Sequence, residues 1–310
     1  MPAAEVSVSP ELVRRLLEAQ QPDLAHLPVR PMAHGWDNVM YRLGDELAVR
    51  LPRRAAGAGL IVHEQRWLPV VAPRLPLPVP APVRAGRPAL GYPWRWSIVP
   101  FLPGQLAARE PPADPAAAAA SLGRFLGALH VPAPAEAPAN PLRGVPLAER
   151  AAAVTEHLGV LGGLVDRDAA MRAWRAALAT PAWGRAPVWL HGDLHPANIL
   201  VHRGSISGVI DFGDITAGDP ATDLSVAWLL LPADCCGAFR ATYHAASGHA
   251  DGDDVWARAR GWALALSLAC LAHSADNPLI AAVGRHGIGA VLGQGAAGGP
   301  ARRGDPAGPP

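Results

Sequence analysis

Apolar residues recur with a helical period over several separate stretches of the chain. The first stretch, residues 7–20, has one apolar face and opens with Ser9 and Pro10, which are typical of the cap and first turn of a helix. The same period predicts further helices over residues 59–71, 114–130, 146–161, 167–179, 237–246 and 253–273, and a last one that ends near Gln294. Helices therefore prevail after residue 114.

Shorter apolar runs separated by turn residues predict strands. VMYRLGDELAVRL has two such runs about Gly44-Asp45 and is typical of a β-hairpin that ends at Leu51. Prolines confine the next segment to short strands, the last of which is WSIV. A second hairpin is predicted between Asn198 and Asp211, where ILV and ISGVI flank the polar turn HRGS.

The order of these elements divides the chain into two unequal parts. Strands prevail in residues 1–100 and helices in residues 101–294, which predicts an α+β protein with a small β-rich N-terminal lobe and a larger helical C-terminal lobe. Residues 295–310 are rich in Gly, Ala and Pro, and we expect a disordered tail there. With 310 residues and 50% hydrophobic content, the chain can bury a substantial core.

The charge balance argues against polyanionic partners. The 27 basic and 26 acidic residues leave a formal net charge of +1, so no global field draws the protein toward nucleic acid or an anionic membrane. The most apolar stretch, 261–273, is too short to span a bilayer. We therefore expect no nucleic-acid and no membrane partner.

Cysteine usage and the N-terminus favour a cytoplasmic location. The three cysteines, Cys235, Cys236 and Cys270, have no metal-ligand spacing, and a vicinal pair is a poor disulfide framework. The N-terminal residues are amphipathic and acidic and do not have the pattern of a signal peptide.

Every basic residue apart from histidine is arginine, because the sequence contains no lysine. A Walker A motif and a lysine Schiff base are therefore both excluded. Any phosphate-binding site must be built from arginine, backbone amides or a metal ion.

The second predicted hairpin brings oxygen ligands together. Its open end places Asn198, just before the first strand, beside Asp211, just after the second. An amide and a carboxylate oxygen are ligands that Mg²⁺ prefers, with phosphate and water completing its shell. Asp193 lies five residues before Asn198 in a loop that Pro196 keeps extended, and it is the candidate general base.

These residues carry a family resemblance. HGDLHPANIL followed by VIDFGD resembles the aminoglycoside phosphotransferase and choline kinase branch of the protein-kinase-like enzymes. The resemblance implies a bilobal kinase-like fold in which Asp193 orients or deprotonates an acceptor hydroxyl. It also implies that Asn198 and Asp211 hold Mg²⁺ on the phosphates of ATP or GTP.

The resemblance implies roles for other residues as well. Arg50 stands where the family usually has a phosphate-binding lysine on the third strand, and Glu64 would be its ion-pair partner. His191 would be a packed loop residue in a catalytic loop that Asp223 anchors. The remaining expectations concern the nucleotide, with Gly35 in a turn over the phosphates and Ser97, Ile98 and Val99 as the hinge beside the adenine.

The leading hypothesis is an ATP- or GTP-dependent O-phosphotransferase that acts on a small-molecule hydroxyl. By resemblance an aminoglycoside or related antibiotic is the first acceptor to consider, and Asn198 disfavours a macrolide, since that branch often has His there. Acidic residues in the second lobe could bind an amine-rich acceptor: Asp214, Asp251, Asp253, Asp254 and Asp276. Choline, homoserine or sugar-like acceptors stay open, as does a monomer or a homodimer.

Other interpretations of the same residues are also open. His191, Asp193 and His195 could form the metal cluster of a hydrolase, and a regulatory protein could bind nucleotide without turnover. Asp219 before Pro220 is interpreted as a helix N-cap. Trp256 and Trp262 lie at helical spacing in an apolar stretch, which predicts core packing.

Overall fold

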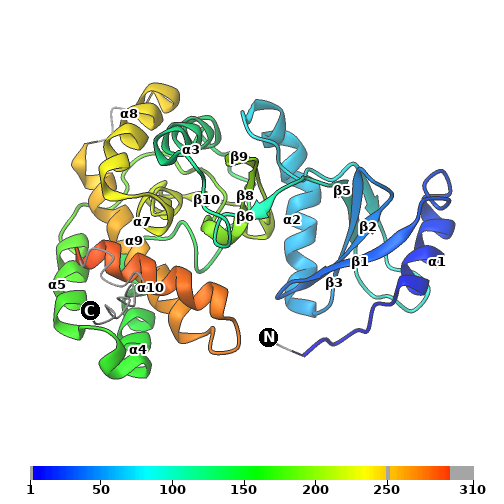
Figure 1. Ribbon diagram of the computed structural model, residues 1–310, viewed down its shortest axis with the longest axis horizontal. Helices are drawn as coiled ribbons and strands as arrows, with labels where there is room; N and C mark the ends of the chain where they lie inside the picture. The colour runs from blue at the N-terminus through cyan, green and yellow to red at the C-terminus, as the bar shows by residue number, and fades with distance from the viewer. Residues whose placement is uncertain (1–2, 249–251, 294–310) are drawn as a thin grey trace, which may run out of the picture.

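The computed structural model describes residues 3–248 and 252–293, and their elements form a strand-rich part beside a helical part (Figure 1). The predicted tail at 295–310 and the candidate acid Asp251 lie outside these residues. The α+β class expected from the sequence is confirmed, with a small strand-rich N-terminal part and a larger helical C-terminal part. In the described part of the chain, no helix combines the length and apolar character needed to cross a membrane.

In the strand-rich part, the described residues form a five-stranded antiparallel sheet in the order β1-β2-β3-β5-β4. The predicted hairpin is present as β2 and β3, with Leu43 opposite Leu47 across the turn. Helix α1, at the N-terminus, packs against this sheet. Its cap is Ser9, whose side chain accepts a hydrogen bond from the Leu12 amide. The bounds are α1 Pro10–Gln20, β1 Val29–His34, β2 Asn38–Leu43, β3 Leu47–Pro52, β4 Arg84–Gly86 and β5 Trp96–Pro100.

Helix α2, Ala55–Val71, connects the two parts. It begins four residues before the predicted start because residues 55–58 are small and leave no apolar period to detect. Its last turns carry Leu68 and Val71 into the core of the helical part, whereas the sheet has a separate core around Trp96 and Tyr92. A short 3₁₀ turn, Ala72–Arg74, ends it.

The helical part also contains two small sheets, and the one with β6, β8 and β9 lies on the side that faces α2 (Figure 1). Strand β8 pairs with both β6 and β9, and β7 pairs with β10. Their bounds are β6 Gln105–Leu106, β7 Val188–Leu190, β8 Ile199–His202, β9 Ser205–Val209 and β10 Thr216–Gly218. The helices are α3 Pro115–Leu129, α4 Ala151–Leu161, α5 Arg167–Leu178, α6 Ala221–Leu224, α7 Val226–Leu230, α8 Cys236–Ser247, α9 Asp253–Ala272 and α10 Pro278–Leu292.

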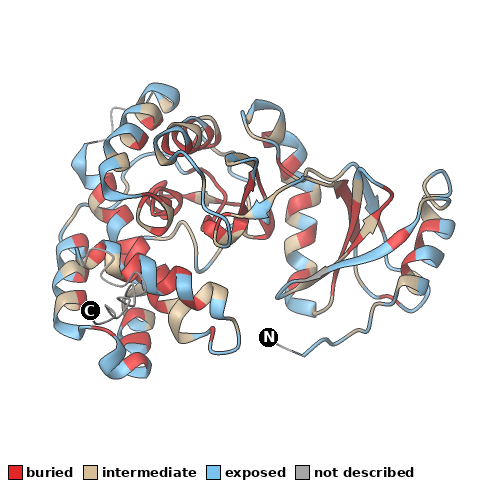
Figure 2. Ribbon diagram, viewed as in Figure 1, coloured by how far each residue is buried: buried red, intermediate tan, exposed pale blue. Residues whose placement is uncertain are grey.

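Helix α9 forms the centre of the helical core. Buried residues run along most of its length, as the red segments of Figure 2 show, and Trp256 and Trp262 are both buried as predicted. Arg258 is buried too, and its guanidinium donates to both carboxylate oxygens of Asp219, at 2.7 and 3.2 Å. Asp219 also accepts from the Ala221 amide at 3.0 Å, but the cap position of α6 is occupied by Pro220 and not, as the sequence indicates, by Asp219.

Candidate functional site

The β8–β9 hairpin brings Asn198 and Asp211 to one end. Ile199 pairs with Val209, and the Ile210 amide donates to the Asn198 carbonyl at 2.9 Å, so the two side chains leave the ribbon at its open end. Asp211 has φ +64°, a left-handed conformation that turns the chain into the 3₁₀ turn Phe212–Asp214. Its side chain stays 54% exposed, which leaves the carboxylate accessible to a ligand.

Asp193 lies next to this open end. The Asn198 side-chain amide donates to the Asp193 carbonyl at 2.9 Å and approaches its Oδ2 at 3.5 Å. Because the amide nitrogen faces Asp193, the amide oxygen of Asn198 points away from it. His195 caps the intervening 3₁₀ turn, Pro196–Asn198, by accepting from the Ala197 amide. The structure therefore brings Asp193, Asn198 and Asp211 together.

The backbone before Asp193 is fixed by a buried carboxylate. Asp223 accepts from the amides of His191 and Gly192, at 2.7 and 2.9 Å, and its Oδ2 lies 3.3 Å from His130. His191 is fully buried, with its Nε2 2.9 Å from the Ile210 carbonyl and its Nδ1 accepting from the Asp193 amide. Asp223 thus contacts the segment that the sequence assigned to it.

Both ring nitrogens of His191 are therefore engaged, and this argues against the metal-hydrolase interpretation. A histidine needs a free ring nitrogen to bind a metal ion. Among the described residues, no group of three or more His, Cys, Asp or Glu side chains is placed to hold one. His191 and His195 therefore act within the loop itself: His191 bonds to the loop backbone, and His195 caps the turn Pro196–Asn198.

A buried arginine links the sheet to the hairpin. Arg50 on β3 donates to Glu64 of α2 and to Asp211, each at 2.5 Å. With the Asn38 amide oriented so that its oxygen faces Arg50, that oxygen accepts from Nη2 at 3.0 Å and from Nε at 3.2 Å. The expected Arg50–Glu64 ion pair is present, and the guanidinium is held by three side chains.

The same contacts set the ionisation of this pair. Burial disfavours the charged guanidinium, but Glu64 and Asp211 outweigh it and hold the pKa of Arg50 above its ordinary value. For Glu64, burial is the largest influence; Arg50 opposes it and Asp211 adds to it, and the pKa rises to about 7. Arg50 therefore stays charged at every physiological pH.

Arg143 and Asn140 are functional-site residues that the sequence interpretation missed. Arg143 donates to Oδ1 of Asp193 at 2.7 Å, and Asn140 donates to Oδ1 of Asp214 at 2.6 Å. Both come from a proline- and alanine-rich loop about fifty residues before the catalytic motif. No local pattern marks such a residue, because its partner is distant in sequence.

Arg143 dominates the electrostatics of Asp193. Burial disfavours the carboxylate, but the Arg143 and His195 charges more than compensate and hold the pKa of Asp193 well below its usual range. The neighbouring Asp214 behaves in the opposite way, because burial and the Asp193 charge raise its pKa. Asp193 is thus ionised at neutral pH.

The expected hinge stays a prediction, and the strand pairing bears on which of its backbone groups are available. Ser97 and Ile98 lie inside β5, paired with β3 on one side and with β4 on the other, and the Ile98 carbonyl accepts from the Val83 amide. A strand that is hydrogen-bonded to a neighbour on each side has few backbone groups left to bind the nucleotide base. Val99 has a partner only on β3, and the chain leaves the sheet after Pro100. The predicted strand WSIV is present as β5, one residue longer than expected.

Gly35 lies in the turn between β1 and β2, as expected. Its amide donates to the Asn38 carbonyl, and the next residues of the turn pack on the start of α2, where a Cβ on Gly57 would come within 2.9 Å of the Asp37 Cβ. The turn is therefore fixed against the helix that carries Glu64.

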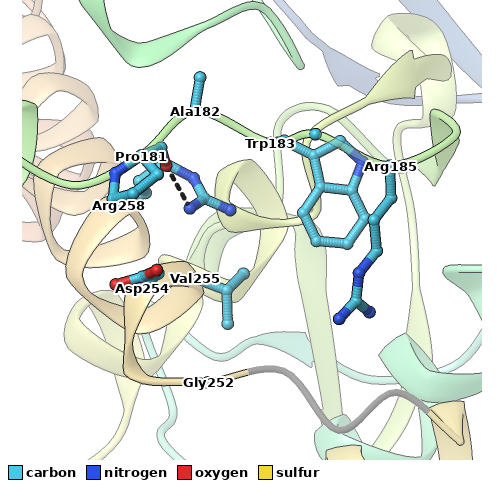
Figure 3. A pocket seen from close by; sticks show the side chains of 9 residues that line it. Pro181, Ala182, Trp183, Arg185, Gly252, Asp254, Val255 and Arg258 are labelled. Carbon is cyan, nitrogen blue, oxygen red and sulfur yellow. Dashed lines mark hydrogen bonds between the residues drawn. The ribbon is translucent and has the colours of Figure 1, made fainter.

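Two of the candidate acceptor-binding acids lie far from Asp193. Burial and then the Asp193 charge raise the pKa of Cys270 to about 12, so the C-terminal end of α9 is within electrostatic reach of Asp193. Asp253 is seventeen residues earlier on the same helix, roughly 25 Å away at 1.5 Å per residue. Asp254 lines a pocket with Trp183 and Arg258 at that far end (Figure 3). Neither acid can line a site at Asp193.

Comparison with known proteins identifies a family. Residues 28–262 match the model of the phosphotransferase enzyme family. An aminoglycoside 2'-phosphotransferase-IIIa, solved as a GDP complex, is 20% identical with a TM-score of 0.68, covering 93% of this chain and 99% of that one. A macrolide 2'-phosphotransferase from Brachybacterium faecium is 22% identical with a TM-score of 0.59, covering 91% and 97%. At these identities the two structures show the shared fold.

Proposed function

Because the chain belongs to the phosphotransferase enzyme family, we propose that it transfers the γ-phosphoryl group of ATP or GTP to a hydroxyl of a small molecule. The observation that carries this proposal is the convergence of Asp193, Asn198 and Asp211 at the open end of one hairpin. Complexes of similarly folded proteins with GDP support a nucleotide co-substrate.

In this proposal Asp193 accepts the proton of the attacking hydroxyl. Its depressed pKa keeps it ionised, so it acts mainly by orienting the hydroxyl through a hydrogen bond and takes the proton late in the reaction. Asp223 and Gly192 hold the backbone that positions it. Asp223 is thus a positioning residue, and His191 fills the space beneath the loop.

The donor set at the hairpin end fits Mg²⁺. The amide oxygen of Asn198 and the exposed carboxylate of Asp211 are hard oxygen ligands, which is the set that this ion accepts with phosphate and water. When bound, Mg²⁺ supplies charge neutralisation for the phosphates. Arg50, oriented by Glu64 and Asn38, would grip the phosphates in place of the usual lysine.

The nucleotide base belongs at the end of β5 in this account. Val99 and residues 100–104 connect the sheet to β6. They lie beyond the part of β5 that is hydrogen-bonded to both β3 and β4, so backbone groups there can bind a nucleotide base. We therefore place the adenine or guanine contact there and not at Ser97 and Ile98. The Gly35 turn would cover the phosphates.

The acceptor is less constrained than the reaction. An aminoglycoside acceptor draws support from the similarity in fold to aminoglycoside 2'-phosphotransferases. A small hydroxyl metabolite is the second candidate, and Arg143 favours it, because this guanidinium neutralises the Asp193 carboxylate, which would otherwise attract a polycation.

Mass-shift screening of hydroxyl compounds with ATP, GTP and Mg²⁺ tests the proposed reaction. We expect one scaffold to gain a phosphate, and Asp193→Asn to lower kcat about 10²- to 10⁴-fold. Asp168→Asn, which removes the same charge from an exposed position on α5, is the matched control. Phosphorylated product at a near-normal rate in Asp193→Asn would contradict the proposal.

A further inference from the structure

A row of basic side chains runs along the loop that contacts Asp193 and into helix α4. Arg143 contacts the base directly, and Arg150 ends the 3₁₀ turn Leu147–Arg150 that leads into α4. About two helical turns further, His157 of α4 lies with its Nε2 2.9 Å from Nε2 of His273, just after α9. The basic row, Arg143, Arg150, His157 and His273, therefore extends from the base toward the C-terminal end of α9.

Polar groups in the basic row are left without partners inside the protein. Arg150 is partly buried and has no side-chain hydrogen bond or ion pair within residues 3–248 and 252–293. Nε of Arg143 and Nδ1 of His157 are buried without a hydrogen-bond partner in the same residues. Unsatisfied buried donors next to a reacting group indicate a ligand that satisfies them.

The positive charges also repel one another. Burial and then the Arg143 charge lower the pKa of Arg150, and burial, His273 and Arg150 lower the pKa of His157 against the opposing charge of Glu156. Burial disfavours the charged form of Arg143, but Asp193 and Asp214 outweigh it and hold the pKa of Arg143 above its ordinary value, so the uncompensated charge is that of Arg150. An anion placed between the two guanidiniums would remove the repulsion.

We propose that the acceptor carries an oxyanion, a carboxylate or a phosphate, near the hydroxyl that is phosphorylated, and that Arg143 and Arg150 bind this oxyanion. This inference rests on the proposed function, because it places the acceptor at Asp193. The acceptor is then a hydroxy acid or a phosphorylated polyol. Arg143 contacts both Asp193 and the acceptor. Its Nη2 donates to Asp193, and the other nitrogens of its guanidinium donate to the oxyanion.

Two matched series of compounds test the charge preference. The first is glycerate, glycerol 3-phosphate, glycerol and 3-amino-1,2-propanediol, and the second is glucuronate, glucose and glucosamine. Binding is measured calorimetrically on the full chain with Mg-ADP present, and turnover is measured with Mg-ATP and Mg-GTP. We expect an anion in at least one series to bind at least about tenfold more tightly than its neutral and amine analogues. Comparison of glycerate with glycerol 3-phosphate separates carboxylate from phosphate.

The variant Arg150→Gln connects the preference to the basic row. It should lower kcat/KM for the anionic compound about tenfold or more and leave the neutral analogue within about threefold, a split that a general folding defect would not produce. Arg150→Lys should restore part of the loss. Arg124→Gln, an exposed arginine of α3, is the control with the same charge change.

Several results would overturn the inference. These are equal or tighter binding of the amine or neutral compounds, no response to any of the anions, or an unchanged preference in Arg150→Gln. Turnover of a neutral or amine compound that still depends on Asp193 would overturn it while the proposed function stands. Absence of Mg-nucleotide binding would remove both.

Discussion

At the scale of single residues, the charge state of Asp193 depends on one partner that is distant in sequence. Arg143 supplies the compensating charge at 2.7 Å, in a position where burial alone would favour the protonated carboxyl. The depressed pKa means that this carboxylate contributes stability above its unfolded value of 3.8, and the contribution is lost as pH falls through the folded pKa.

The variant Arg143→Gln should change the pH profile in a defined direction. Without the guanidinium, burial raises the pKa of Asp193, so the acidic limb of kcat/KM moves to higher pH. In the wild type, Asp193 should contribute no acidic limb above pH 4. The measurement is kcat/KM between pH 4.5 and 8 for both proteins, with Arg124→Gln as control. Superimposable profiles for wild type and Arg143→Gln would show that Arg143 does not set the ionisation of the base.

At the scale of elements, the catalytic loop depends on a backbone shape that only glycine adopts easily. Gly192 has φ +88°, and a Cβ there would lie 2.3 Å from the Asp214 carbonyl oxygen. The loop between β7 and β8 therefore packs directly on the turn that follows β9. This contact ties Asp193 to the hairpin that carries Asn198 and Asp211.

Gly192→Ala should consequently disturb both stability and activity. We expect a loss of at least about 2 kcal/mol in the free energy of unfolding, from the left-handed backbone and the clash together, and a lower kcat. Gly163→Ala is the matched control, since no atom lies within 4 Å of a Cβ there. Urea denaturation gives the stability difference. A Gly192→Ala protein as stable and active as the control would mean that the loop is looser than described.

The sequence predicts elements with a strong local pattern far better than contacts between them. The amphipathic helices and both hairpins could be located, as could Asn198 and Asp211, because a hairpin fixes which residues meet at its open end. The position of β4 and its pairing with β5 could not be located, since prolines interrupt the segment around them. Arg143 could not be assigned, because its partner lies fifty residues away and is fixed only by tertiary packing.

At the scale of the whole molecule, two buried ionic contacts connect distant parts of the chain. Arg50 joins the sheet to the hairpin through Asp211, 161 positions away. Arg258 joins the N-terminal part of α9 to Asp219, just before α6, and it also donates to the Pro181 carbonyl, the dashed line in Figure 3. The first contact lies at the proposed nucleotide site, and the second is far from it along α9.

Arg258→Ala should therefore affect stability throughout the helical part. Removal of one partner leaves Asp219 buried and uncompensated, and such losses amount to about 3–5 kcal/mol. Arg124→Ala on the exposed face of α3 should stay within about 0.5 kcal/mol of the wild type. Chemical denaturation measures both. If Arg258→Ala costs no more than Arg124→Ala, the Asp219 carboxylate has found another partner or water.

The metal-dependent affinity for nucleotide tests the central claim most directly. Titration calorimetry of ATP and GTP, with Mg²⁺ and with a chelator, is carried out on the wild type and on three single variants, Asp211→Asn, Asp193→Asn and Asp168→Asn. The account predicts that Asp211→Asn loses at least about tenfold of the Mg²⁺-dependent affinity, whereas Asp193→Asn binds within about threefold of the wild type. Equal Mg²⁺-dependent affinity in Asp211→Asn and the wild type would contradict it.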